Sequence, residues 1–315
     1  MKKNILATIA LMGALAWTAC QKEQLVEDQP IMEPETIAQN DSVWTLSLRA
    51  VKTDDLLTKG LAIGEGDTEA ATTVLKSVWN TGDQVHVYVG DRHIGILSAV
   101  PDDGNPSSAT LWGTVTTAGI NPGVTTLTLL TPRQVWDYTG QNGSLLITDD
   151  ATNSIEAKYN YTMAENVPVV TATGGVITTG TATFINQQSI YRMSFRYGDP
   201  KTAINTKSVS ITGQGHFVQR YTLGNISATV TGAISVTLAQ ATTNPFFVAI
   251  SNEFANGNEE TFNFTVVDGD GITYKGSKTI PASYNNNGSF VSMKNATLTS
   301  RLDMSLNSTT KDVVL

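Results

Sequence analysis

Residues 78–88 read VWNTGDQVHVY and hold the pattern that decides the fold. The tetrapeptide NTGD at 80–83 is rich in residues that favour tight turns. Directly after it, Val85 and Val87 alternate with His86 and Tyr88. Alternation with a period of two places one set of side chains on each face of a strand. The segment therefore predicts a turn followed by a strand with one apolar face.

The same alternation recurs on both sides of this segment. Before it, the run at 44–51 places Trp44, Leu46, Leu48 and Ala50 on one face of a strand. After it, alternating runs lie at 127–129, 191–197, 234–238 and 262–266, separated by turn signals at 101–106, 121–123, 141–143, 268–271 and 285–288. Short alternating strands with regular turns predict an all-β fold of antiparallel β-sandwiches.

The length of the chain bounds the number of domains. A chain of 315 residues accommodates about two domains of ~100–200 residues each. A stretch of small residues from Thr173 to Gly180 separates two halves that are rich in predicted strands. We therefore expect an N-terminal β-sandwich domain at 44–180 and a C-terminal β-sandwich domain at 181–315.

The first twenty residues have the pattern of an export signal. Lys2 and Lys3 precede an apolar run at 5–16, which is shorter than the ~20 residues that cross a membrane. Cys20 is the only cysteine, and the small residues before it resemble a bacterial lipobox. That resemblance implies that residues 1–19 are a lipoprotein signal peptide and that Cys20 is the lipidated first residue of the mature chain. The alternative is an ordinary signal peptide followed by an incidental free cysteine.

Residues 20–43 are expected to form a flexible tether between the lipid anchor and the folded part. This stretch is polar and acidic, contains two prolines and has no apolar periodicity. The whole chain has a net charge of −8, and 15% of its residues are charged. Nucleic-acid binding needs a basic surface, so this balance excludes a nucleic-acid partner. A single cysteine likewise excludes an intramolecular disulfide framework.

The sequence contains no constellation that supports catalysis or metal binding. His86 is predicted on a strand, His93 in the next turn and His216 far along the chain, with no carboxylate at ligand spacing. No G-x-S-x-G motif is present. The acidic turn at 268–271 fits a hairpin better than a calcium loop, because Thr279 stands where such a loop has a bidentate Glu. We expect no catalytic residue, no cofactor and no metal, and a protein that is not an enzyme.

Three aromatic residues near predicted turns bear on sugar binding. Trp112, Trp136 and Tyr138 would form a platform for a sugar ring if they were exposed. The more common fate of such residues is packing in a core or on a sheet face. The sequence therefore leaves a glycan platform open as an alternative.

Several motifs follow one another in a recognisable order. A lipoprotein signal precedes the strand at 44–51, the tripeptide TKG at 58–60 and a W-x-x-G-D-x-V-x-V-Y pattern at 79–88. ATF at 182–184 and IYR at 190–192 begin the second half, and NPFFVAI at 244–250 comes late. Over nearly the whole chain, this order resembles the fimbrillin family of Bacteroidetes, the major-fimbrium-like subunits of type V pili. The resemblance implies two transthyretin-like β-sandwich domains, an outer-membrane lipoprotein precursor, and a structural or adhesive role at the cell surface.

The resemblance also bears on proteolytic processing. Shaft subunits of the family have an arginine after the first strand, where a trypsin-like protease cuts. Here Arg49 lies inside the predicted strand, and Lys52 and Lys59 are the basic residues that follow. Cleavage after Lys59 would remove the strand whole and leave Gly60 as the new N-terminus. Lys59 is therefore the preferred processing site, with Arg49 and an uncleaved chain as the alternatives.

The end of the tether contains a candidate modification site. Asp41-Ser42-Val43 resembles the O-glycosylation signal of the same phylum, in which an Asp precedes a hydroxyl residue and an aliphatic residue follows it. The match covers three residues only. Ser42 is therefore a candidate for O-glycosylation, and an unmodified serine in a linker is the alternative.

The C-terminal region has a long alternating pattern. From Ala296 onward, the even positions carry Leu298, Leu302, Met304 and Leu306, and polar residues take most of the odd positions. One interpretation is a final strand that packs on its own domain. The other is a donor strand that leaves its domain and fills a groove in the next subunit.

Two functions of different classes follow from these observations. The leading one is a structural or adhesive subunit of a fimbria at the cell surface, whose partners are other fimbrial subunits and the outer membrane. The alternative is a monomeric glycan-binding lipoprotein, whose partners are surface glycans or proteins. High-mass polymers that resist SDS would favour the first, and a monomer retarded on a polysaccharide gel would favour the second.

Overall fold

The computed structural model describes residues 42–52, 78–214, 217–223, 232–251, 257–282, 285 and 290–302. These residues form strands joined by turns, with one short helical segment, η1 (Ile155–Tyr159). The predicted all-β class is thus confirmed. The strands are β1 (Val43–Lys52), β2 (Gln84–Val89), β3 (Arg92–Asp102), β4 (Asn105–Thr116), β5 (Thr126–Thr131), β6 (Val135–Asp137), β7 (Thr162–Thr173), β8 (Val176–Thr179), β9 (Ala182–Asn186), β10 (Ser189–Tyr197), β11 (Thr202–Ala203), β12 (Thr206–Thr212), β13 (Arg220–Thr222), β14 (Ile234–Thr242), β15 (Phe246–Ile250), β16 (Glu260–Asp268), β17 (Thr273–Ile280), β18 (Phe290–Thr297) and β19 (Ser300–Leu302).

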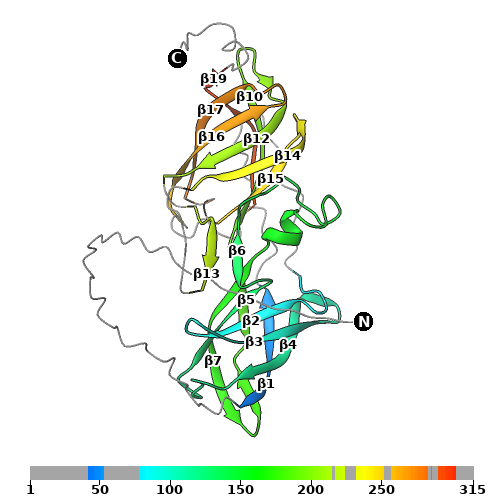
Figure 1. Ribbon diagram of the computed structural model, residues 1–315, viewed down its shortest axis with the longest axis vertical. Coiled ribbons are helices and arrows are strands. Elements are labelled where there is room, and N and C mark those ends of the chain that lie inside the picture. Colours follow the sequence, from blue (N-terminus) through cyan, green and yellow to red (C-terminus); the bar gives the residue numbers. More distant parts are fainter. Residues whose placement is uncertain are drawn as a thin grey trace, which may run out of the picture. The chain divides into compact units, whose positions relative to one another are not determined.

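The first nine strands, except β6, form one sheet (Figure 1). Its order is β4-β3-β2-β5-β7-β8-β1-β9, and β1 also pairs with β4. Because β1 has partners on both sides, the ladder of hydrogen bonds closes on itself through this strand. A closed ladder leaves few exposed edges, which removes the usual templates for unwanted strand pairing. The N-terminal half is therefore one closed sheet, and β1 is the strand that closes it.

The core of this sheet follows the alternation in the sequence. Val85 and Val87 of β2 are fully buried, as are Leu127 and Leu129 of β5. They share one cluster with residues of β1, β3, β4, β7, β8 and β9 and with Trp79, whose ring meets that of Phe184 edge to face at 5.0 Å. The W-x-x-G-D motif thus supplies a buried indole before its turn and a strand with one apolar face after it.

Two further sheets make up most of the C-terminal half. One has the order β11-β10-β15, with β18 paired to β10, and the other has the order β14-β12-β16-β17-β19. Aromatic contacts join them: Tyr191 of β10 lies 5.1 Å from Phe262 of β16, and Phe195 lies 5.3 Å from Phe264, measured between ring centroids. All four side chains are buried. The two sheets therefore pack face to face around an aromatic core.

The small-residue stretch at 173–180 contains a local turn. Gly174 and Gly175 have φ angles of +60° and +84° and connect the antiparallel strands β7 and β8, a conformation that glycine adopts without steric cost. The core contacts do not divide at residue 180. Phe184 follows residue 180 but packs in the core of the N-terminal sheet. Trp136 precedes residue 180 but packs with the core of the C-terminal sheets. The division into domains at 44–180 and 181–315 remains a prediction.

Candidate functional site

β1 is the part of the described chain with the most unusual placement. It pairs antiparallel with β4 over nine residues, from Val43 opposite Thr116 to Val51 opposite Ser108. Its other edge runs parallel to β8 and then to β9. Figure 1 shows β1 in blue beside β4. The first strand of the described residues is thus inserted between two edges formed later in the sequence.

The inward side chains of β1 belong to the core. Leu46, Leu48 and Ala50 have exposed fractions of 0%, 4% and 0%. Full burial of a leucine side chain stabilises a fold by about 1.5–3 kcal/mol. The outward residues Thr45 and Ser47 are exposed. Loss of β1 would therefore leave an apolar groove between two strand edges whose backbone groups lack partners.

The N-terminal end of β1 is fixed by backbone hydrogen bonds. The carbonyl of Ser42 accepts from the amide of Thr117 at 3.1 Å, and the amide of Thr45 donates to the carbonyl of Gly175 at 2.9 Å. The residue Ser42 itself is exposed. The candidate O-glycosylation site thus lies at the solvent-facing start of β1, and its modification stays a prediction.

A buried lysine ends β1. The Nζ atom of Lys52 donates to the carbonyl of Val78 at 2.6 Å and lies 4.1 Å from the ring centroid of Trp79. The carboxylate of Asp83 is 3.9 Å away. Burial lowers the pKa of Lys52 to about 8, and the nearby charge of Asp83 offsets part of that effect. Lys52 therefore links the end of β1 to the W-x-x-G-D turn, and its side chain is too buried to serve as a protease recognition residue.

Of the two candidate processing residues, the structure describes Arg49 but not Lys59. Arg49 lies within β1, opposite Thr110 of β4, and its guanidinium makes two hydrogen bonds to the carboxylate of Asp102, one of them at 2.7 Å. The next residue, Ala50, pairs on both sides, with Ala109 and Ala182. The peptide bond after Arg49 is therefore held inside a paired strand. Lys59 and Cys20 lie outside the described residues, and both assignments remain predictions.

The C-terminal candidates lie in the link between β18 and β19, in β19 itself and in the region beyond it. Leu298 is buried at 3% exposure, and its amide donates to the carbonyl of Arg196 at 2.9 Å. Leu302 ends β19 and pairs with Thr273 of β17. Met304 and Leu306 lie outside the described residues. The alternating pattern therefore does not form one strand. The segment pairs with β10 up to Thr297 and with β17 from Ser300 onward.

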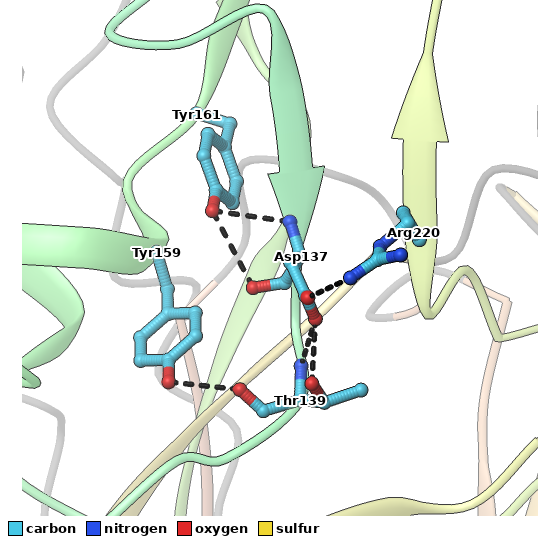
Figure 2. Close-up of polar contacts among 5 residues, drawn as sticks. All are labelled: Asp137, Thr139, Tyr159, Tyr161 and Arg220. Atoms are coloured by element: carbon cyan, nitrogen blue, oxygen red, sulfur yellow. Dashed lines mark hydrogen bonds and ion pairs between the residues drawn. The ribbon is translucent and has the colours of Figure 1, made fainter. Parts of the chain in front are cut away.

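A polar network around β6 shows how a two-stranded pairing is fixed (Figure 2). Arg220 of β13 donates to the carboxylate of Asp137 at 2.9 Å, and Thr139 donates to it from both its amide and its hydroxyl. The hydroxyls of Tyr159 and Tyr161 donate to the carbonyls of Thr139 and Asp137 at 3.0 and 3.4 Å. Burial raises the pKa of Asp137, but the hydrogen bonds from Thr139 and Arg220 outweigh it, and the net pKa lies below its usual value. These bonds link β6 to β13 through Asp137 and to η1 through Thr139.

The aromatic candidates for a sugar platform differ in exposure. Trp136 and Tyr138 are 2% and 0% exposed, so both pack in the core. Trp112 of β4 is 55% exposed. It lies between Ser47 of β1 and Ser98 of β3, which are its direct cross-strand partners. Only Trp112 of the three is therefore placed for contact with a partner at the surface.

The structure also places the acidic turn at 268–271 and the histidines His86 and His93. The carboxylate of Asp268 accepts hydrogen bonds from the amides of Asp270 and Ile272 at 2.9 and 2.8 Å, and strands β16 and β17 form a hairpin around this turn, as predicted. Among the described residues, no three His, Cys, Asp or Glu side chains form a metal-binding group, and no helix is long and apolar enough to cross a membrane. The sequence spacing did not predict that His86 and His93 would lie together, with ring nitrogens 3.4 Å apart.

Comparison with known proteins finds several solved structures that resemble this chain at low sequence identity. No protein-family model matches the chain, and no curated protein matches it. A solved structure of a putative cell adhesion protein from Bacteroides ovatus is 13% identical, with a TM-score of 0.36 over 83% of this chain and 97% of that one. A putative adhesin from Bacteroides ovatus is 10% identical, with a TM-score of 0.42 over 82% of this chain and 89% of that one. A fimbrial protein from the same species is 10% identical, with a TM-score of 0.29 over 82% of this chain and 51% of that one.

Proposed function

We propose that this chain is a structural and adhesive subunit of a cell-surface fimbria that assembles by strand exchange. The observation that carries the proposal is the placement of β1. It closes the N-terminal sheet between β4 and the β8–β9 edge, and it comes first in the folded part. A single cut between Lys52 and Val78 would separate β1 from the rest of the chain, leaving it held by non-covalent contacts alone.

The groove left by β1 would suit an extended segment from another subunit. Strand addition gains affinity from backbone hydrogen bonds, and alternating side chains set the register. The inward positions of β1 are Leu46, Leu48 and Ala50, spaced by two. A shift of one residue would place polar side chains in the core, so the register of an incoming strand is strongly specified.

The donor in this proposal is the C-terminal segment beyond Thr299. Leu302, Met304 and Leu306 have the same spacing of two as the inward residues of β1. Leu298 is buried in the core of its own half, so it would stay there and anchor the donor to its subunit. The donor would then begin near β19, which pairs with only three residues of β17.

The remaining parts of the proposal concern processing and location. Cleavage after Lys59 is preferred over cleavage after Arg49, because the bond after Arg49 is enclosed by pairing on both sides. Cys20 would anchor the precursor to the outer membrane through its lipids, and the partners would be other fimbrial subunits. Both halves would belong to the transthyretin-like β-sandwich class that the sequence resemblance implies.

A reversible lock on β1 tests the proposal directly. Thr45 and Thr114 are exposed and directly opposite each other on β1 and β4. Opposite residues in antiparallel strands have Cα separations of about 4.5–5.5 Å, within the range that a disulfide spans. In the double variant Thr45→Cys/Thr114→Cys, the oxidised chain should fail to form SDS-resistant polymers and a reductant should restore them. The single variants Thr45→Cys and Thr114→Cys should polymerise in both states. Equal polymerisation of the oxidised double variant would contradict strand exchange at β1.

One observation supports the alternative function, glycan binding. Trp112 presents an exposed indole between two serines, which resembles a platform for one face of a sugar ring. The variant Trp112→Ala separates the two functions. A glycan binder would lose retention on a polysaccharide gel, whereas a fimbrial subunit would still form polymers.

A further inference from the structure

A β-bulge in the hairpin of β2 and β3 places two histidines on the same face. Along this pair, Val87 lies opposite Gly95, but the next residue, Tyr88, lies opposite His93. Ile94 is the extra residue, and its side chain is 4% exposed in the core of the N-terminal sheet. Bulges redirect side chains in this way and are common beside functional sites. The bulge therefore turns His93 to the side of the sheet that carries His86.

The two imidazole rings face each other through specific atoms. Nδ1 of His86 lies 3.4 Å from Nε2 of His93. This separation is longer than the 2.7–3.2 Å of an ordinary hydrogen bond to nitrogen donors. Tyr88 contacts the ring of His93 edge to face, with 5.1 Å between the ring centroids. The pair is thus held close by its surroundings without a good hydrogen bond of its own.

Backbone carbonyls stand beside both rings. The carbonyl of Pro132 stands beside the ring of His86, and the carbonyl of Gly95 stands beside the ring of His93. A neutral imidazole that donates from one nitrogen accepts at the other. When each ring carries its proton on the nitrogen that faces away from the other ring, the two nitrogens that face each other are available as lone-pair donors. Histidines that bind metals characteristically donate their other N–H to a carbonyl or carboxylate, and a carbonyl stands beside each ring here.

Gly95 has a steric role at this place. A Cβ atom added to it would lie 2.4 Å from the carbonyl oxygen of Thr114 on β4. Its lack of a side chain lets β3 approach β4 at the bulge. The same residue thus permits the bulge and places its carbonyl beside His93.

The separation of the nitrogens matches one kind of metal centre. Two imidazole nitrogens bound to a tetrahedral zinc ion at about 2.0–2.1 Å are about 3.3–3.4 Å apart. His93 is exposed and His86 is 8% exposed, so an ion can reach the pair from one side.

We propose that His86 and His93 together bind one zinc ion in a two-histidine site on the β2–β3 hairpin. The described part of the chain contributes no third ligand of the usual kinds. Water or a donor group from another molecule would fill the remaining tetrahedral positions. The site is thus open, in the way that catalytic and bridging zinc sites keep an exchangeable position. The proposal is independent of strand exchange.

Zinc titration of the full chain by isothermal calorimetry tests this inference. Cys20→Ser is present in every protein, so that the thiol does not bind the metal. One zinc ion should bind per chain, and His93→Gln and His86→Gln should each weaken binding by about tenfold or more, because each removes one of two protein ligands. The control is His216→Gln, at a histidine outside the described residues, and this variant should bind zinc like the parent.

Two results would overturn the assignment. One is an absence of binding up to about 1 mM zinc, beyond which an interaction is weaker than about 4 kcal/mol. The other is binding in His93→Gln that equals the parent. Thermal unfolding without zinc checks each variant for folding. Because His93 is exposed, His93→Gln decides the test even if the buried His86→Gln variant does not fold.

Discussion

Leu48 of β1 lies directly opposite Leu111 of β4, and both side chains are buried in the core of the N-terminal sheet. The pair joins the first strand of the described residues to a strand that begins more than fifty residues later. The core of this sheet is therefore complete only while β1, or another strand of the same pattern, occupies its place.

Truncation of Leu48 measures how much the uncleaved chain depends on β1. Leu48→Ala should lower the free energy of unfolding by about 2–5 kcal/mol, because it removes buried methyl groups and leaves a cavity. The control Ser47→Ala lies on the exposed face and should stay within about 0.5 kcal/mol of the parent. Urea denaturation gives both values. A Leu48→Ala chain as stable as the Ser47→Ala chain would show that β1 is not part of the cooperative core.

The buried lysine at the end of β1 predicts a pH dependence of stability. The pKa of its side chain is about 8 in the folded chain, against an ordinary value of 10.5 for lysine. Between these values the unfolded chain holds a proton that the folded chain lacks, so stability rises with pH in this window and is lost as the pH falls through about 8. The difference corresponds to about 3 kcal/mol in favour of the neutral side chain.

Lys52→Met tests this dependence. The variant has no charge to bury, so its unfolding free energy at pH 7 should equal or exceed that of the parent, and its advantage should shrink as the pH approaches 10. Chemical denaturation of both chains at pH 7 and near pH 10 provides the comparison. A loss of several kcal/mol at pH 7 would mean that the hydrogen bond to Val78 and the contact with Trp79 outweigh the cost of burial.

Two truncations separate the structural part of the C-terminus from the proposed donor. A chain that ends at Thr299 keeps the buried Leu298 and should remain a folded monomer that does not polymerise. A chain that ends at Thr297 also loses Leu298 and should be less stable by about 1.5–3 kcal/mol. Circular dichroism and size-exclusion chromatography distinguish the two. Normal polymers from the chain ending at Thr299 would rule out donation by this segment.

The lipid anchor can be tested separately. Cys20→Ser should release the protein from the membrane fraction and abolish labelling with palmitate, because the thioether-linked lipid has no attachment point. Cell fractionation and metabolic labelling give the two readouts. A Cys20→Ser chain that still carries palmitate and stays with the outer membrane would show that another residue is modified.

The local pattern of the sequence predicted the strands but not their partners. The alternation at 44–51 gave the inward and outward faces of β1, since the period of two is a local property. Pairing of β1 with β4, β8 and β9 joins distant segments, and closure of the sheet cannot be read from local alternation. For the same reason the pattern that starts at Ala296 did not reveal that the chain changes sheets after Thr297.

The histidine pair shows the same limit within a single hairpin. A regular register would place Ile94 opposite Tyr88, and His93 would lie away from His86. The bulge shifts the register by one residue, and a shift of one residue exchanges the faces of a strand. The small residue Gly95, which the bulge requires next to β4, was the one sequence signal that could have indicated it.

The most direct test of strand exchange is the N-terminal sequence of the protein isolated from surface polymers. The proposal predicts a mature N-terminus at Gly60, with no peptide from the region 44–59 in a mass-spectrometric digest of the polymers. An intact peptide that spans Trp44 to Lys59 in the polymers would contradict the removal of β1 and, with it, the proposed mode of assembly.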